Sequence, residues 1–273
     1  MPKTTRDDLA PARSYPVLYI DETGRMEQDT RVAVEEPLTI RANGKPLATL
    51  MRTPGEEIPL CVGFLLTEGI VQSYDDILLV RHCLQDDMED PNVVNAMLRP
   101  TVDLSQTRHR LVYSSCGICG PEAIELVCRS TKPLQGQPVP LSVLHALPDE
   151  MRRHQRLFAD TGGTHAAALF DVRGQLLFLS EDIGRHNALD KTVGKAFMQD
   201  ADPADMLLML SGRVSYEMIA KAARVGIATI AAVSAPTSLA VETALKLNQT
   251  LIGFLRNGRL TLYSGGGSIR NDE

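Results

Sequence analysis

The stretch "DMLLMLSGRVSYEMIAKAARVGIATIAAVS" (residues 205–234) predicts the fold class of this chain. An apolar run ends at Ser211-Gly212, a helical pattern continues up to Gly226, and a second apolar run follows at once. Strands that are apolar throughout are typical of a sheet buried on both faces, in which helices connect parallel strands. The stretch therefore predicts an α/β sheet with helices on both sides.

The same alternation extends in both directions from this stretch. The further predicted elements are a helix at residues 141–157, a hairpin at 165–180, a helix at 187–198, a helix at 238–248 and a strand at 250–255 followed by a turn at Asn257-Gly258. In open α/β sheets, ligands bind at the carboxyl ends of the strands. The turns that follow the predicted strands are therefore candidate binding segments.

The front of the chain has a different pattern. Residues 31–51 contain two extended runs around Asn43-Gly44, the strongest short signal for a β-hairpin. A helix is expected between Thr53 and Gly69, followed by two strands, so this part reads as an α+β unit. We expect a smaller N-terminal α+β domain at residues 15–106 and a C-terminal domain at 107–273. The first 16 residues and the glycine-rich end, "YSGGGSIRNDE", are expected to be loosely ordered.

Composition limits the classes of function. The 273 residues carry a formal charge of -6 and 4% aromatic residues, which argues against a nucleic-acid-binding protein. No apolar run is long enough to cross a membrane, and the N-terminus does not resemble a secretion signal. Five cysteines are an odd number and form a poor disulfide framework. We therefore expect a soluble cytoplasmic protein.

The pair Cys116 and Cys119, in "YSSCGICGPEA", is the first candidate site. A structural zinc site needs about four ligands, and the chain has no second cysteine pair, although His165 or His186 would complete such a site. A redox pair at a helix start and a nucleophilic thiol on a flexible, glycine-flanked loop both fit the spacing. The spacing alone does not distinguish redox chemistry from group transfer.

Two histidines and several strand-end residues form further candidates. His165 follows two glycines, and His186 follows Arg185 before a predicted helix. Each histidine taken alone fits a core or capping role, but two of them in small-residue turns indicate a shared cleft. Arg213 follows one predicted strand, and Ser234 and Thr237 follow the next. Free N–H groups at helix N-termini bind anions, so these positions predict a phosphate-bearing ligand.

Seven segments together resemble one family, the formate dehydrogenase accessory sulfurtransferases. They are "EEPLTIRANGKPLATLMRTPGEE", "GFLLTEGI", "SSCGICG", "TGGTHAAALF", "EDIGRHNALDK", "LSGRVSYEMIAKAA" and "FLRNGRLTLY", and they occur in the family's order over residues 31–263. The resemblance implies a C-terminal three-layer α/β/α domain of the cytidine-deaminase-like fold. It also implies a homodimer.

The resemblance further implies a function. Members of the family accept sulfur as a persulfide from a cysteine desulfurase and transfer it to the molybdenum or tungsten bis-pterin guanine dinucleotide cofactor, which formate dehydrogenase needs. Cys116 corresponds to the persulfide-bearing cysteine and Cys119 to its partner. The cofactor-binding segment corresponds to Phe254, Leu255, Arg256, Asn257, Gly258 and Arg259. No resident metal is expected. The alternative hypothesis is a non-catalytic chaperone that binds the cofactor and docks formate dehydrogenase.

Overall fold

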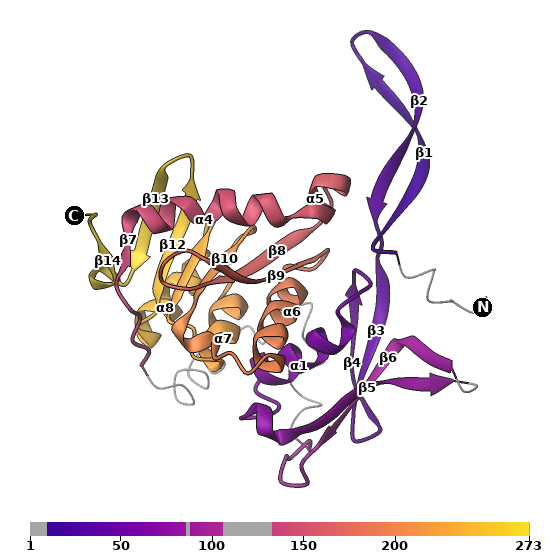
Figure 1. Cartoon of the computed structure of the whole chain (residues 1–273), viewed down its shortest axis with the longest axis horizontal. Helices are drawn as coiled ribbons and strands as arrows, with labels where there is room; N and C mark the ends of the chain where they lie inside the picture. The colour runs from indigo at the N-terminus through magenta and orange to yellow at the C-terminus, as the bar shows by residue number, and fades with distance from the viewer. Residues whose placement is uncertain (1–9, 86–87, 106–132, 273) are drawn as a thin grey trace.

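Two β-sheets and a projecting β-ribbon organise the chain in the computed structural model, which describes residues 10–85, 88–105 and 133–272 (Figure 1). The front part contains β1 (Ala12–Asp21), β2 (Gly24–Ala33), β3 (Glu36–Ala42), β4 (Lys45–Arg52), α1 (Glu57–Thr67), β5 (Ile77–Gln85) and β6 (Met88–Leu98), with a 3-10 turn, η2, at Tyr74–Asp76. The C-terminal part contains β7 (Val139–Pro140), α4 (Leu141–His154), α5 (Arg156–Thr161), β8 (His165–Phe170), β9 (Leu176–Asp182), α6 (Arg185–Met198), β10 (Leu207–Leu210), α7 (Tyr216–Arg224), β11 (Thr229–Ala232), α8 (Ser238–Leu247), β12 (Thr250–Arg256), β13 (Arg259–Ser264) and β14 (Ile269–Arg270), with 3-10 turns η3 at Pro203–Asp205 and η4 at Gly266–Ser268.

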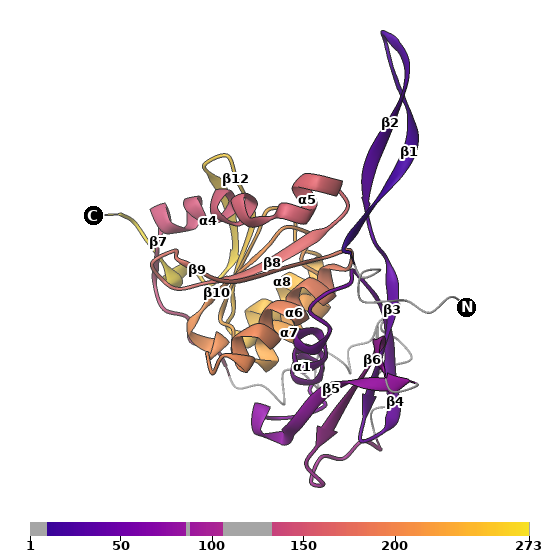
Figure 2. The same ribbon diagram turned by 45° about the vertical axis from the view of Figure 1, so that its right-hand side comes forward.

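The C-terminal sheet confirms the predicted mixed α/β architecture. Its strand order is β13-β12-β11-β10-β8-β9, with β10, β11 and β12 parallel and β8, β9 and β13 antiparallel to their neighbours. Helix α4 covers one face, and α6, α7 and α8 cover the other (Figures 1 and 2). Along β10, Leu208 and Leu210 are buried in one core while Leu207 and Met209 are buried in the other. Burial on both faces explains why this strand is apolar throughout.

The front part forms a four-stranded sheet in the order β4-β3-β6-β5, and helix α1 packs on it. Asn43 and Gly44 have φ angles of 49° and 78° and connect β3 to β4, which confirms the predicted hairpin turn. Strand β6 begins at Met88 and includes the acidic residues Glu89 and Asp90. The predicted boundary between the domains falls at residues 106–107, which lie outside the described residues.

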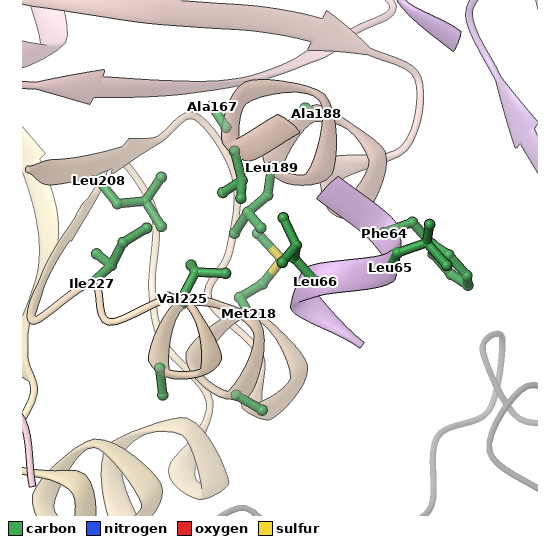
Figure 3. Packing of buried hydrophobic residues seen from close by; sticks show 14 of the residues in the cluster. Phe64, Leu65, Leu66, Ala167, Ala188, Leu189, Leu208, Met218, Val225 and Ile227 are labelled. Atoms are coloured by element: carbon green, nitrogen blue, oxygen red, sulfur yellow. The ribbon is translucent and has the colours of Figure 1, made fainter. Parts of the chain in front are cut away.

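Helix α1 also packs against α6, so a single apolar core continues from the front sheet into the C-terminal unit (Figure 3). Two glycines allow the close approach. A Cβ atom on Gly63 of α1 would lie 1.8 Å from the carbonyl oxygen of Asp190, and one on Gly194 of α6 would lie 1.9 Å from that of Pro59. The two helices therefore touch backbone to backbone, and no larger residue fits at either position.

A buried lysine joins three helices beside this contact. The Nζ atom of Lys221 in α7 lies 2.9 Å from Asp190 Oδ2 in α6 and 2.7 Å from Glu68 Oε1 at the end of α1. Thr67 completes the group by donating a hydrogen bond to Asp190 at 2.7 Å. Burial favours the neutral amine, but Asp190 and Glu68 outweigh it, so the pKa of Lys221 is raised. Lys221 therefore remains charged and fixes α1 to the C-terminal unit.

A second buried pair fixes the segment that precedes α1. Lys191 Nζ lies 2.8 Å from Asp182 Oδ2 and donates to the carbonyl oxygen of Thr53 at 2.8 Å. Asp182 also accepts hydrogen bonds from the backbone N–H of Thr53 at 3.0 Å and from Asn187 Nδ2 at 2.9 Å. Because every member has partners, this buried group carries no uncompensated charge.

The β1–β2 ribbon, here called the arm, projects from the body as a long twisted hairpin (Figure 2). It corrects the expectation of a loosely ordered N-terminus, since Ala12–Pro16 already pair with β2. The physical reason is local: Thr23 N and Gly24 N donate to the Asp21 carboxylate at 2.7 Å and 3.2 Å, which closes a tight turn between the two strands.

Two further expectations are corrected. The predicted helix at residues 141–157 is broken at Gln155 (ψ 72°), and α5 starts anew because the Glu181 carboxylate accepts hydrogen bonds from the N–H groups of Leu157 and Phe158 at 2.8 Å and 2.7 Å. The glycine-rich end is ordered, since β14 pairs with β7 and Asp272 accepts a hydrogen bond from Ser142 N at 3.1 Å. In both segments, contacts with residues distant in sequence determine the local structure.

Candidate functional site

The predicted sulfur-carrying residues, Cys116 and Cys119, lie outside the described residues. Within the described ranges, no three His, Cys, Asp or Glu side chains gather in a way that could hold a metal ion. Cys61 is buried in α1, and burial raises the pKa of its thiol to about 12. Cys61 is therefore an inert core residue. The predicted ligand-binding residues, in contrast, lie within the described part of the chain.

His165 starts β8 next to the carboxyl end of β10. Thr161 ends α5, and Gly162 follows in the left-handed conformation (φ 67°), which turns the chain toward the strand. The neighbouring Ala166 pairs with Ser211 through two hydrogen bonds of 3.0 Å and 2.8 Å. A Cβ atom on Gly212 would lie 3.1 Å from His165 Nδ1, so the ring lies directly over this turn. His165 and the turn after β10 thus form one surface.

Two arginines act on His165. Burial, then the charges of Arg185 and Arg213, lower the pKa of its imidazole below the usual value. Arg185 is the first residue of α6 and Arg213 follows β10, so the cations reach the histidine from two different elements. Gly184 precedes α6 as its N-cap without a side-chain hydrogen bond, and the positive end of the helix dipole adds to the same region. We call His165, Arg185, His186 and Arg213 the strand-end cluster.

His186 is held by an acidic partner. Its Nε2 atom lies 2.9 Å from Glu217 Oε2 in the first turn of α7, and this contact lowers the pKa of Glu217. Burial opposes ionisation of the neighbouring Glu68, but the positive charges of Lys221, Arg224 and His186 outweigh it and lower its pKa as well. His186 thus connects the strand-end cluster to the buried lysine group.

The cations of the strand-end cluster have unused hydrogen-bonding capacity. Among the described residues, no carboxylate forms an ion pair with Arg185 or Arg213, and the buried Nε of Arg185 has no hydrogen-bond partner. The Ser215 hydroxyl, at the N-cap of α7, is also buried without a partner within the described ranges. Buried polar groups are normally satisfied, so these groups indicate a place for an anionic ligand.

The turns after β10 and β11 lie side by side. Val214 N donates to Ala235 O at 3.1 Å, and Thr237 N donates to Val214 O at 2.9 Å. Thr237 serves as the N-cap of α8, because its hydroxyl accepts a hydrogen bond from Ala240 N at 3.3 Å. The Thr237 hydroxyl therefore already accepts a hydrogen bond from the first turn of α8. The carbonyl oxygen of Ser234 accepts a hydrogen bond from Phe254 N at 3.1 Å.

The hydrogen bond between Phe254 and Ser234 joins the turn after β11 to the hairpin between β12 and β13. Phe254 has φ 51°, an unusual conformation for an aromatic residue, and sits at a shift in the strand register. A Cβ atom on Gly253 would lie 2.9 Å from Pro236, so the bulge packs against the turn after β11. The Phe254 ring is 37% exposed. Backbone strain that holds an aromatic ring at the surface is a feature of binding sites.

Arg256 lies over the Phe254 ring, and Arg259 pairs with Arg256 across the hairpin. Asn257 and Gly258 form the predicted turn with φ angles of 51° and 67°, which makes Arg256 and Arg259 direct cross-strand neighbours. The Arg256 guanidinium carbon lies 5.8 Å from the centre of the Phe254 ring. Like charges opposite each other destabilise a hairpin unless an anion lies between them. We call Phe254, Arg256 and Arg259 the hairpin cluster.

The structure thus places predicted residues in two groups at one edge of the sheet, and the turn after β11, with Ser234 and Thr237, lies between the two groups. Leu255 belongs to neither group, because its side chain is fully buried in the core and anchors the hairpin. Successive strands lie about 4.8 Å apart, so the turns from β8 to β12 span roughly 15 Å. An edge of this length can contact several phosphate groups of one ligand.

Comparison with known proteins supplies the family. The model of the FdhD/NarQ family matches residues 33–270. The chain belongs to the FdhD/NarQ family. A sulfur carrier protein FdhD of Nocardia farcinica is 41% identical over 93% of this chain and 94% of its own length, and the one of Mycobacterium tuberculosis is 44% identical over 85% and 89%. The archaeal relative from Saccharolobus solfataricus is 37% identical over 92% and 96%.

A solved structure shares the fold of this FdhD/NarQ chain. The crystal structure of a candidate formate dehydrogenase accessory protein from Desulfotalea psychrophila superposes with a TM-score of 0.78 over 96% of this chain and all of that chain, at 23% identity. Membership of the FdhD/NarQ family confirms the resemblance drawn from the seven sequence segments. No helix in the described part of the chain has the length and apolarity of a membrane span.

Several residues of the FdhD/NarQ segments were not selected from the sequence. The sequence pattern does not single out Arg185 or Ser215 as binding residues. Their signal was position, since each stands at the N-terminal end of a helix that follows a predicted strand. The buried residues Thr53, Asp182, Asp190, Lys191 and Lys221, which fix the two parts of the chain together, also lie in these segments.

Proposed function

We propose that this protein is a sulfurtransferase, which takes persulfide sulfur from a cysteine desulfurase and transfers it to a molybdenum or tungsten bis-pterin guanine dinucleotide cofactor. Formate dehydrogenase needs that cofactor in its sulfurated form. Membership of a family whose relatives are named sulfur carriers supports the proposal. As part of it, we assign the C-terminal α/β/α unit to the cytidine-deaminase-like fold and the protein to the cytoplasm.

One structural observation carries the proposal: two cationic groups line a single sheet edge in an acidic protein. The strand-end cluster offers Arg185 and Arg213 without carboxylate partners among the described residues, and the hairpin cluster offers Arg256 and Arg259 beside an exposed ring. A bis-pterin guanine dinucleotide carries two pyrophosphates and two purine bases. Planar guanidinium groups bind phosphate oxygens in pairs, and an aromatic ring stacks on a base.

The proposed chemistry uses Cys116 as the nucleophile. Its thiolate attacks the terminal sulfur of the desulfurase persulfide, a new S–S bond forms on Cys116, and the desulfurase cysteine leaves as a thiolate. The terminal sulfur then leaves as sulfide for the metal of the bound cofactor: a thiolate attacks the inner sulfur of the persulfide, the persulfide S–S bond breaks, and the two remaining sulfurs form a disulfide that a thiol reductant later reduces. Cys119 either receives this sulfur or attacks Cys116, which closes a disulfide and releases sulfide. The products distinguish these two roles.

Loading of the persulfide tests the proposal directly. The protein is incubated with a cysteine desulfurase and cysteine, and the peptide that contains Cys116 is examined by mass spectrometry. We expect one added sulfur in the wild type and in the Cys119→Ser variant, and none on this peptide in Cys116→Ser. Absence of added sulfur in the wild type, or its persistence in Cys116→Ser, would contradict the proposal.

Binding of the cofactor is tested separately with GDP as the probe. A charge-assisted hydrogen bond contributes about 1.5–3 kcal/mol, so Arg259→Ala should weaken GDP binding about tenfold or more, and Arg256→Ala similarly. The Cys116 persulfide should still form in both variants. Calorimetry measures the GDP affinity of each single variant. Unchanged affinity in both variants would show that the hairpin cluster is not part of the cofactor-binding site.

The alternative is a non-catalytic chaperone that holds the cofactor and docks formate dehydrogenase. In a strain that lacks the endogenous protein, the alternative predicts active formate dehydrogenase with both Cys116→Ala and Cys119→Ala. Sulfur transfer predicts loss of activity with Cys116→Ala. The Arg259→Ala variant lowers activity under either hypothesis and therefore serves as the reference for cofactor binding.

A further inference from the structure

Helices α6 and α7 are joined by two contacts between groups of opposite charge, one helical turn apart. His186 and Asp190 are four residues apart on α6, and Glu217 and Lys221 are four residues apart on α7. Residues at this spacing lie on the same face of a helix. His186 Nε2 lies 2.9 Å from Glu217 Oε2, and Lys221 Nζ lies 2.9 Å from Asp190 Oδ2. We call the first contact the outer pair and the second the inner pair.

The two pairs differ in burial. The side chains of the inner pair, Asp190 and Lys221, are 1% and 6% exposed, whereas those of the outer pair, His186 and Glu217, are 27% and 35% exposed. A buried ion pair is costly to break, so the inner pair fixes α7 against α6. Glu217 therefore faces His186 from a helix that is already held in place, and a ligand of the strand-end cluster can reach the outer pair.

Glu217 is an anion beside a site that is proposed to bind phosphates. Its ion pair is with His186, and among the described residues it forms none with Arg185 or Arg213. A carboxylate repels a phosphate, so the charge of Glu217 by itself weakens binding at the strand-end cluster. A role in ligand binding must therefore come from what Glu217 does to His186.

The contact with Glu217 determines which nitrogen of the His186 ring carries a proton. A nitrogen lone pair and a carboxylate oxygen repel each other at 2.9 Å, so a proton lies on Nε2. Nδ1 is then the ring nitrogen that remains for a ligand. A carboxylate that holds an imidazole in one tautomer and one orientation is a common arrangement behind a functional histidine.

Charged groups from four elements act on His186. Glu217 on α7 and Glu68 at the end of α1 are negative, and His186 interacts with both. Arg185 precedes His186 on α6, and His165 lies near both of them at the start of β8. The two carboxylates stabilise the ring with protons on both nitrogens, and in that form Nδ1 donates to a phosphate oxygen.

We propose that Glu217 is a positioning residue for the phosphate groups of the ligand, because it holds His186 so that Nδ1 donates a hydrogen bond to a phosphate oxygen. The inference rests on the proposed function, since it concerns the same cofactor site, but it involves no step of sulfur transfer. Ser215 stands at the N-cap of the same helix, with a buried hydroxyl that has no partner within the described ranges. The start of α7 thus contributes to the site through Ser215 directly and through Glu217 indirectly.

The sign of the change in GDP affinity tests the proposal. If Glu217 only adds a negative charge or only stabilises α7, Glu217→Ala should leave GDP binding unchanged or strengthen it. If Glu217 positions His186, Glu217→Ala should weaken GDP binding about fivefold, the equivalent of one well-oriented hydrogen bond. Glu217→Gln keeps an oxygen that accepts from Nε2, so its affinity should fall by at most about twofold. Glu242→Ala, at an exposed position of α8, is the control and should not change the affinity.

A double-variant cycle shows whether Glu217 acts through His186. His186→Ala should weaken GDP binding about tenfold, the equivalent of one charge-assisted hydrogen bond. In the His186→Ala background, Glu217→Ala should cause no further loss, because the ring that it positions is absent. Nitrogen-15 NMR of the histidine side chains gives an independent readout in the free protein. His186 should carry a proton on Nε2 in the wild type and in Glu217→Gln, whereas in Glu217→Ala both ring nitrogens should share a single proton.

The outcomes distinguish this inference from the proposed function. A wild type that binds no GDP contradicts the cofactor site and the role of Glu217 together. A wild type that binds GDP, with equal or tighter binding in Glu217→Ala, overturns the role of Glu217 alone. Additive losses in the double variant, or an unchanged NMR signature in Glu217→Ala, would also overturn it. If Glu217→Ala does not fold, Glu217→Gln decides, because a purely repulsive charge predicts tighter GDP binding in that variant.

Discussion

Lys191 and Arg185 lie less than two turns apart on helix α6, and their surroundings are opposite. Lys191 is buried and paired, since its ammonium group contacts the Asp182 carboxylate and the Thr53 carbonyl oxygen. Arg185 stands at the start of the helix, and among the described residues no carboxylate pairs with it, while its buried Nε has no acceptor. The two cations are close in sequence, but one has an anionic partner and the other has none among the described residues.

The comparison separates structural charges from binding charges. A buried ion pair with every hydrogen bond satisfied fixes two elements in one arrangement, and the groups at Lys191 and Lys221 fix the front part of the chain to the C-terminal unit. A cation without a partner favours an anion from outside. The strand-end cluster is therefore expected to respond to ligands, whereas the two lysine groups should affect folding.

Removal of a structural charge should have the largest effect. Lys221→Met leaves Asp190 and Glu68 buried without their cation, so the free energy of unfolding should fall by about 3–5 kcal/mol. Urea unfolding followed by circular dichroism measures the change. Lys246→Met, at an exposed position of α8, is the matched control and should change stability by less than about 0.5 kcal/mol. Equal stability of the Lys221 variant and the wild type would refute the assigned role.

The glycine contact between α1 and α6 should give the next largest effect. Alanine normally stabilises a helix interior by about 1 kcal/mol relative to glycine. In Gly63→Ala the sign should reverse, because the new methyl group would lie 1.8 Å from a carbonyl oxygen. We expect a loss of about 3 kcal/mol, the upper end for overpacking. Gly267→Ala meets no atom within 4 Å and should be neutral in the same unfolding assay.

Removal of a binding charge should leave the fold intact and weaken ligand binding. Arg185→Ala and Arg213→Ala should each lower GDP affinity about tenfold, the equivalent of one charge-assisted hydrogen bond. Isothermal titration calorimetry measures the affinity, and Arg173→Ala, in the distant turn between β8 and β9, serves as the control. If the two variants lose stability instead of affinity, the distinction between the two kinds of charge fails.

The smallest effect concerns protons. Burial and two arginines lower the pKa of His165, so its imidazole is neutral near pH 7 in the free protein. A bound pyrophosphate raises that pKa, so GDP binding should take up a proton and strengthen as the pH falls from neutral toward the lowered pKa of the free protein, by at most tenfold per pH unit. Calorimetry in two buffers of different ionisation enthalpy counts the protons. The His165→Gln variant should no longer take up the proton that His165 binds. Unchanged proton uptake in this variant would show that His165 is not the group that is protonated when GDP binds.

The sequence by itself determined the parts of this protein that depend on local pattern. Apolar runs joined by helical segments predicted the covered sheet, because a strand buried on both faces cannot carry polar residues. Asn43-Gly44 and Asn257-Gly258 predicted their turns, because both positions adopt positive φ. The segments from residue 31 to residue 263 were sufficient to predict the family.

The tertiary structure alone decided which residues meet. Nothing local distinguishes the paired Lys191 from the unpaired Arg185, because the Asp182 and Thr53 contacts depend on how α1 and α6 pack. The arm escaped prediction because its alternating pattern includes Pro16 and many charges, and a ribbon without a sheet beside it has no strong apolar signal. Contacts between residues more than a hundred positions apart, such as Thr53 and Asp182, depend on how the helices pack in the core. A short stretch of sequence does not contain that information.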